Sequence, residues 1–141
     1  MKEIGNHKKA NQIVGNVGLY YVCYELSKRG WNALPTSRNA KGVDVVIYNQ
    51  KATQSHTIQV KALSEKNPVP FGSNLDNLTA EYVIICRKVF DEKPEMFIIK
   101  SNEVKEGIHK GEKDNKISYW LQPKDYEKYK DKWDIIGDGY E

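Results

Sequence analysis

Hydrophobic and polar positions divide the chain into one long helical segment followed mainly by strands. Apolar residues recur at helical spacing over residues 10–29, and Gly30 after Lys28 and Arg29 is a usual C-terminal stop. Two apolar faces run along this segment: Ile13, Val17, Tyr20 and Tyr24 on one, and Gly15, Leu19, Val22, Cys23 and Leu26 on the other. We therefore expect a helix that is covered over most of its circumference, with a sheet on one side.

Five later segments have the alternation and composition of β-strands. They are residues 31–36, 43–48, 55–63, 82–86 and 95–99. The polar connection 49–54 predicts an antiparallel hairpin between the second and third, and the almost wholly apolar fourth segment predicts a central strand. The pattern indicates an α/β fold with a mixed central β-sheet of about four to five strands, flanked by helices.

The remaining segments are less regular. Residues 64–79 contain two prolines and no clear period, which predicts a long loop that is functional or mobile. A short helix is expected from Ser101, whose side chain offers a cap, to about residue 109, then a polar link, an aromatic strand over 117–121 and a short helix over 123–129. No repeat or linker divides the chain, so we expect one domain over 1–141, with a core of about 10–100 and a C-terminal extension of 101–141.

Composition excludes some function classes. No apolar run approaches the roughly 18 residues of a membrane helix, and the first residues lack a signal peptide's apolar stretch, so we expect a cytoplasmic protein without membrane contact. Cys23 and Cys86 share no metal-ligand spacing and are expected to be reduced core residues, while the three histidines lie far apart. A zinc site is not expected.

Charge is distributed unevenly although the net charge is only +3. Residues 1–61 hold nine Lys/Arg against three Asp/Glu, whereas residues 62–141 hold thirteen against sixteen. A basic first half would attract a polyanion such as DNA or RNA. Ordinary solubilising surface charge explains the same counts equally well.

Three polar residues of neighbouring strands form the candidate site. Side chains alternate along a strand, so Gln59 and Lys61 share a face, and Asp44 at the start of the preceding strand can join them. One carboxylate, one amide and one amine would then converge. A turn entering one strand and the polar face of another would give the same residues without a site.

These residues resemble the motif of the PD-(D/E)XK, or restriction-endonuclease-like, nuclease superfamily in its Gln-x-Lys variant. The resemblance covers roughly residues 10–100, and the relatives it points to include Holliday-junction resolvases and Mrr-like small nucleases. The matching parts are the glycine-containing first helix, the segment 37–44 that ends in Gly42-Val43-Asp44, and Ile58-Gln59-Val60-Lys61.

The resemblance implies hydrolysis of DNA phosphodiesters by a hydrolase of the endonuclease type with Mg²⁺ (or Mn²⁺). Asp44, Gln59 and Lys61 take the catalytic positions, and Asp44, Gln59 and the main-chain carbonyl of Val60 take the metal-ligand positions. Mg²⁺ prefers such oxygen ligands, and Lys61 beside it would stabilise charge that develops on the phosphate. Relatives often dimerise, so a homodimer is possible, although no segment is diagnostic of an interface.

Four further residues are candidates for nucleic-acid binding. Arg38, Asn39 and Lys41 precede Asp44, and Lys66 follows Lys61 in the long loop. Each is also explained as a solvated loop residue. The tyrosines suggest base stacking, but Tyr20 and Tyr24 on the helix and the aromatics of 126–133 recur at helical spacing, which favours packing.

The chain departs from the superfamily pattern at Leu19. Relatives often carry a glutamate just after the second glycine of a G-x-x-G on the first helix, and here Leu19 follows Gly18. Because Gln59 is neutral as well, Asp44 is the only anionic ligand expected. The alternative function is a catalytically degenerate module on the same fold that binds nucleic acid or another protein.

Overall fold

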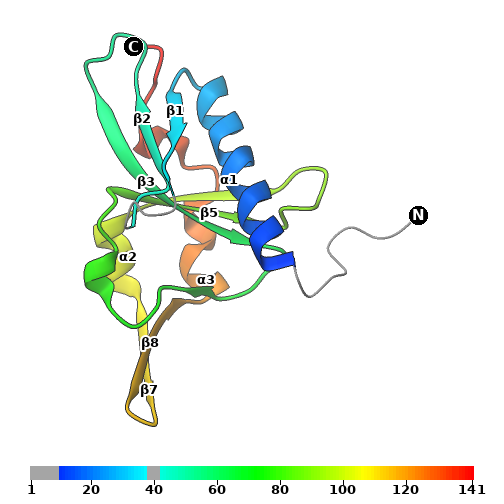
Figure 1. Cartoon of the computed structure of the whole chain (residues 1–141), viewed down its shortest axis with the longest axis vertical. Helices are drawn as coiled ribbons and strands as arrows, with labels where there is room; N and C mark the ends of the chain where they lie inside the picture. The colour runs from blue at the N-terminus through cyan, green and yellow to red at the C-terminus, as the bar shows by residue number, and fades with distance from the viewer. Residues whose placement is uncertain (1–9, 38–41) are drawn as a thin grey trace.

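A five-stranded mixed sheet forms the centre of the computed structural model, which describes residues 10–37 and 42–141 (Figure 1). Its strands are β1 (Asn32–Pro35), β2 (Val45–Tyr48), β3 (Ser55–Leu63), β5 (Tyr82–Arg87) and β6 (Glu95–Lys100). They lie in the order β1-β2-β3-β5-β6, and every neighbouring pair is antiparallel except the parallel pair β3/β5. The predicted mixed sheet of an α/β fold is confirmed.

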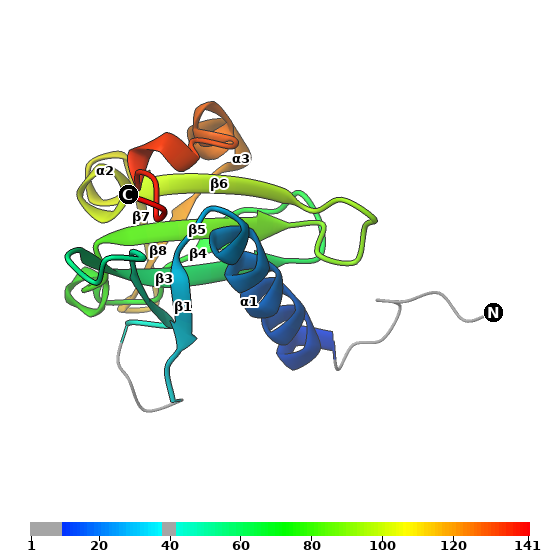
Figure 2. The same ribbon diagram turned by 90° about the horizontal axis from the view of Figure 1, so that it is seen from above.

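Helix α1 (Ala10–Lys28) covers one face of this sheet and runs obliquely across β3 and β5 (Figure 2). Val14, Val22 and Leu26 are buried against inward-facing side chains such as Ile58 and Ile84. Their spacing of four or eight residues puts them on one side of the helix, so this first core forms between one helix face and one sheet face.

The other sheet face packs against a second, three-stranded sheet and most of the short helices that follow β3. This sheet has the order β4 (Val69–Pro70), β8 (Lys116–Leu121), β7 (His109–Lys113). The helices on this side are α2 (Ser101–Gly107), α3 (Pro123–Tyr126) and the 3-10 turns η1 (Leu75–Asn77) and η2 (Glu127–Tyr129), whereas Trp133 of the 3-10 turn η3 (Trp133–Ile135) packs with the first core. Phe71, Val83, Phe97 and Tyr126 are among the buried members of this second core. The hairpin of β7 and β8 extends away from the body (Figure 1).

Three expectations for the segments after β3 were wrong. The stretch 64–79 contains the short strand β4 and the turn η1, and the polar link after residue 107 contains β7. Asp114 and Asn115 connect β7 to β8 with positive φ values of 52° and 65°, as a two-residue hairpin turn requires. Lys100, not Ser101, is the N-cap residue of α2, and no side chain caps that helix.

Within the described parts of the chain, nothing covers the outer side of α1, contrary to expectation. Ile13, Tyr20 and Tyr24 are exposed, because the sheet reaches only the opposite side of the helix. The packing predicted for the later aromatics is confirmed by buried Tyr126 and Trp133. Cys86 is buried as expected, whereas Cys23 is only partly buried; both are free thiols.

Within residues 10–37 and 42–141, no helix is long and apolar enough to cross a membrane.

Candidate active site

Strands β2 and β3 separate at Asp44, and the Asp44 side chain bridges the gap. The Asp44 N–H donates to the Ile58 carbonyl at 2.8 Å, and the Asp44 carbonyl accepts from the Thr36 N–H at 2.9 Å. One step further along β3, the Val60 N–H donates to Asp44 Oδ2 at 2.8 Å. The carboxylate therefore replaces the main-chain acceptor that β2 would have supplied had it continued.

The Val60 carbonyl faces the same gap between the strands. In a strand, the N–H and C=O of one residue point to the same neighbour, and residues two apart point the same way. Ile58 and Val60 both direct these groups toward β2. The main-chain oxygen of Val60 is thus directed to the place where the Asp44 carboxylate lies.

Gln59 and Lys61 project from the sheet face opposite α1. Val60 and Ala62 pack with the first core, so alternation places Gln59 and Lys61 on the other face, with Leu63 beside the second core. The side-chain oxygen Oε1 of Gln59 is buried and has no hydrogen-bond partner among the described residues. Leaving such an oxygen unpaired typically costs about 1–3 kcal/mol, which points to a ligand or water for it.

Lys61 lies in an apolar environment with one nearby negative charge. Its ammonium is 4.9 Å from the centre of the Phe71 ring. Burial lowers the pKa of Lys61, and the Asp44 carboxylate opposes part of that effect. Lys61 is therefore close enough to Asp44 to respond to its charge.

A small pocket connects Asp44 with α1. It has a volume of about 200 Å³ and is lined by Asn11, Gly15, Leu19, Asp44, Val60 and Ala62. Leu19 therefore places an apolar side chain in the same pocket as Asp44. Asn11 was not identified from the sequence, although its i, i+4, i+8 spacing with Gly15 and Leu19 already puts it on this side of the helix.

The predicted residues are thus brought together only in part. Asp44 and Val60 are in direct contact, Lys61 lies within electrostatic reach, and Gln59 and Lys61 emerge on the sheet face opposite the pocket under α1. Lys66 pairs with Glu127 at 3.8 Å, at the edge of a shallow pocket that also contains Lys124. Three of the predicted contacts to nucleic acid, Arg38, Asn39 and Lys41, lie outside the described residues.

The oxygen atoms at this site suit Mg²⁺ but supply little negative charge. Asp44 contributes the one carboxylate, and the unpartnered Gln59 oxygen and the Val60 carbonyl are neutral donors of the kind that Mg²⁺ accepts. Over residues 10–37 and 42–141, no three His, Cys, Asp or Glu side chains are grouped so that they could hold a metal ion. As a Mg²⁺ site, this set of donors would supply one negative charge and would need phosphate to complete it.

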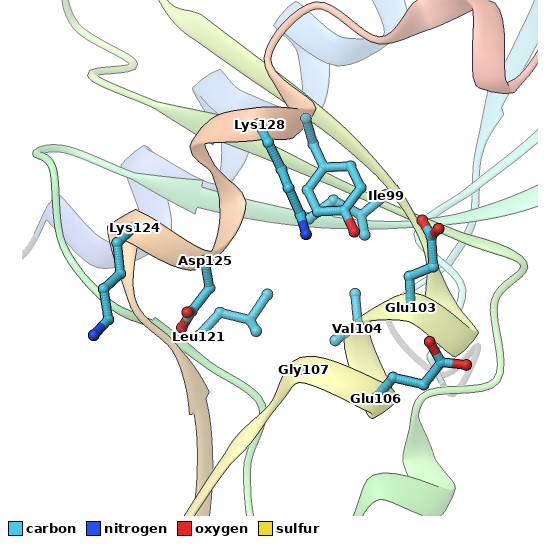
Figure 3. A pocket seen from close by; sticks show the side chains of 10 residues that line it. Ile99, Glu103, Val104, Glu106, Gly107, Leu121, Lys124, Asp125 and Lys128 are labelled. Atoms are coloured by element: carbon cyan, nitrogen blue, oxygen red, sulfur yellow. The ribbon is translucent and has the colours of Figure 1, made fainter.

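A larger cavity of about 320 Å³ lies between α2 and α3, away from Asp44 (Figure 3). Lys128 points into it from one side and Val104 from the other, Asp125 lies at its edge, and Tyr129 is a further lining residue. Asp125 is already engaged, since its Oδ2 is 2.8 Å from His109 Nε2 and accepts from the Gln122 N–H at 2.8 Å. The lining mixes acids and bases and selects no ligand class.

Comparison with known proteins supports the fold. No protein-family model matches the sequence, and no curated protein matches it either. Among solved structures, the chain is similar to Hjc of Archaeoglobus fulgidus, a Holliday junction resolvase from an archaeal hyperthermophile, with a TM-score of 0.54 and 18% sequence identity over 76% of this chain and 89% of that chain. The chain therefore has the PD-(D/E)XK, or restriction-endonuclease-like, fold of that resolvase.

Proposed function

We propose that this protein is a nuclease that hydrolyses phosphodiester bonds in DNA with the help of Mg²⁺ or Mn²⁺. The observation that carries the proposal is the buried oxygen of Gln59, which has no partner in the described part of the chain, on the strand that also donates to the Asp44 carboxylate. Similarity to a Holliday junction resolvase supports DNA as the substrate. The basic first half of the chain supports a polyanionic ligand as well.

Asp44, Gln59 and Val60 are the residues that would hold the cation. When bound, Mg²⁺ would neutralise phosphate charge and favour attack by water. The hydrogen bond from Val60 fixes the orientation of the Asp44 carboxylate, so this anionic ligand is positioned before substrate arrives. Because Asp44 is the one carboxylate at this site among the residues that the structure describes, the phosphate of DNA would complete the charge, and cation and DNA are expected to bind cooperatively.

Lys61 would stabilise the negative charge that develops on the phosphate. Its lowered pKa comes from burial, and a buried ammonium has fewer waters to lose when it meets an anion. Contact with the Phe71 ring restricts where the ammonium can lie.

A cleavage assay tests the proposal. Purified protein is incubated with four-way-branched, nicked, single-stranded and linear DNA in Mg²⁺ or Mn²⁺, beside Asp44→Asn and Lys61→Met. We expect cleavage of at least one substrate by the wild type and a loss of at least 100-fold in each variant, the scale seen when one charge-stabilising group is removed. Cleavage that persists undiminished in both variants would exclude this site.

Leu19 favours a second candidate, a non-catalytic DNA-binding domain. This side chain occupies the pocket beside Asp44 where superfamily members often have a glutamate, so an anionic metal ligand is missing there. In this case the wild type binds DNA with an affinity that falls steeply with salt, and no DNA is cleaved in either metal. Absence of both binding and cleavage would contradict both candidates.

A further inference from the structure

The β7–β8 hairpin, which extends away from the body (Figure 1), has one face that carries lysines but no carboxylate. Residues paired across two antiparallel strands lie on the same face. That face is formed by three cross-strand pairs: His109 and Trp120, Gly111 and Ser118, and Lys113 and Lys116. The structure describes the whole hairpin, and its two carboxylates lie elsewhere, Glu112 on the opposite face and Asp114 in the turn. We call the six paired residues the basic face.

Lys113 and Lys116 form the outer end of the basic face. Both are exposed, and they lie directly opposite each other beside the turn. Among the residues that the structure describes, neither ammonium group is paired with a carboxylate. Like charges that face each other across two strands destabilise the pair. An anion bound between the two ammonium groups would remove this repulsion, and a backbone phosphate is such an anion.

Stacked rings hold the inner end of the basic face in place. The Trp120 ring stacks on the His109 ring, with centres 5.7 Å apart and planes at 19°. His109 Nε2 is in turn 2.8 Å from Asp125 Oδ2 on α3. A Cβ at Gly111 would lie 3.0 Å from the Trp120 ring, so the missing side chain leaves room for that ring to lie against β7. The position of the basic face is therefore fixed relative to α3.

Two more lysines lie next to the inner end of the basic face. His109 lines a shallow pocket together with Lys66 and Lys124. Lys124 points away from the cavity between α2 and α3 (Figure 3). Lys66 lies 3.8 Å from Glu127, which is bound more closely by Arg87 at 2.7 Å. Strand β7 spans about 13 Å from its first to its last residue, so lysines lie at both ends of a surface about four base pairs long.

Phe71 connects this surface to the candidate active site. The Phe71 ring centre lies 4.9 Å from the Lys61 ammonium. The Phe71 N–H donates to the Tyr119 carbonyl at 2.9 Å, and the Tyr119 N–H donates to the Gly72 carbonyl at 2.9 Å. Tyr119 precedes Trp120 on β8, so the inner end of the basic face is anchored to the same loop residue that contacts Lys61.

We propose that the basic face, together with Lys66 and Lys124, binds the phosphates of DNA that extends beyond the bond at the candidate active site. The DNA backbone presents regularly spaced negative charges, which suit lysines at both ends of one surface. Contacts of this kind position DNA without reading its sequence. The inference rests on DNA being the ligand of the proposed function and deepens it, since it names the surface that holds the DNA outside the reacting bond.

Fluorescence anisotropy tests this surface with labelled duplex and four-way-branched DNA, in EDTA so that no DNA is cleaved. Lys116→Gln removes one charge from the basic face, and Lys110→Gln removes one from the opposite face of the same hairpin. We expect Lys116→Gln to raise the dissociation constant about threefold or more and to lower the slope of log affinity against log salt by about one unit, whereas Lys110→Gln changes neither. The double variant Lys113→Gln/Lys116→Gln should lower the slope by about two units.

Failure of this inference is distinguishable from failure of the proposed catalysis. Equal effects of Lys116→Gln and Lys110→Gln on binding would overturn the inference even if the wild type cleaves DNA, and so would absence of DNA binding by the wild type. Weaker binding by Lys116→Gln alone, without any cleavage by the wild type, would support the inference and contradict the catalysis. Circular dichroism verifies that each variant remains folded.

Photo-cross-linking locates the contact on the hairpin. In a Cys23→Ser background, Ser118→Cys and Glu112→Cys proteins are labelled with the same photoreactive group. Both positions are exposed, the first on the basic face and the second on the opposite face. The proposal predicts that the group at position 118 cross-links to DNA several times more efficiently than the group at position 112, because DNA lies along the basic face. Equal or greater cross-linking from position 112 would contradict the proposal.

Discussion

Asp44 has a structural role that can be separated from its charge. Its Oδ2 accepts the hydrogen bond from the Val60 N–H where β2 ends. Asp44→Ala removes the acceptor and should lower the free energy of unfolding by about 1–3 kcal/mol. Asp44→Asn keeps an acceptor of the same shape and should cost less than half as much, while still losing cleavage. Urea denaturation gives the two stabilities; equal losses would mean that the bond to Val60 contributes nothing.

A substitution at Leu19 makes the opposite change, because it adds a metal ligand instead of removing one. Leu19→Glu places a second carboxylate in the pocket that contains Asp44 and Val60. Two carboxylates hold Mg²⁺ and Mn²⁺ more tightly than one, so we expect Mn²⁺ affinity to rise by on the order of tenfold, measured by isothermal titration calorimetry. Leu19→Gln, which is polar and similar in size but neutral, is the control and should leave affinity nearly unchanged. Equal binding by Leu19→Glu and wild type would place Leu19 away from any cation.

The sequence was informative about the site only at the level of residue type and strand face. Alternation correctly indicated that Gln59 and Lys61 share a face. It did not indicate that the Asp44 carboxylate turns to the edge of β3, because that depends on where β2 and β3 separate. The buried state of the Gln59 oxygen depends on the second core, which includes residues distant in sequence.

At the scale of elements, a matched pair of glycines in α1 tests how closely the helix approaches the sheet. A Cβ at Gly18 would meet the Cβ of Ala62 on β3, whereas one at Gly15 would have nothing within 4 Å. Gly18→Ala should therefore destabilise the protein by about 1–3 kcal/mol through overpacking. Gly15→Ala should stabilise it by about 0.5–1 kcal/mol, since alanine favours the helix. Thermal unfolding measures both; stabilisation by both variants would mean that α1 is not held against β3.

Elements with a strong hydrophobic period were predictable, and those formed by tertiary pairing were not. The strand over 55–63 matches β3 residue for residue. β7 was not predicted, because His109–Lys113 is mostly polar and forms a strand only by pairing with β8. β4 has two residues, too few for any period. The exposed side of α1 was not predicted. The helix has apolar residues around most of its circumference, so its sequence does not indicate which side faces solvent.

On the scale of the whole molecule, buried Arg87 connects the central sheet to the C-terminal part. Its guanidinium pairs with Glu95 of β6 at 2.9 Å and with Glu127 of η2 at 2.7 Å. It also lies over the Phe97 and Tyr126 rings at 4.7 Å and 5.6 Å. Because Arg87 is only 4% exposed, removing either carboxylate leaves a buried charge less well compensated. The network therefore joins the second core to the sheet that carries the candidate site.

Glu95 makes this connection sensitive to acid. The hydrogen bond from Arg87 lowers the pKa of Glu95 to about 2 from a usual 4.5. The folded state thus binds fewer protons than the unfolded state between these values, so the stability that Glu95 contributes is complete above pH 4.5 and is lost as the pH falls toward 2.

Glu95→Gln should lower the free energy of unfolding by roughly 2 kcal/mol at pH 7, and this difference from the wild type should shrink between pH 4.5 and pH 2. Glu112→Gln, at an exposed position on β7, is the control and should differ little from the wild type at either pH. Tryptophan-fluorescence urea titrations at several pH values measure these differences, and a Glu95→Gln deficit that persists unchanged to pH 2 would show that the pairing of Glu95 with Arg87 does not depend on its charge.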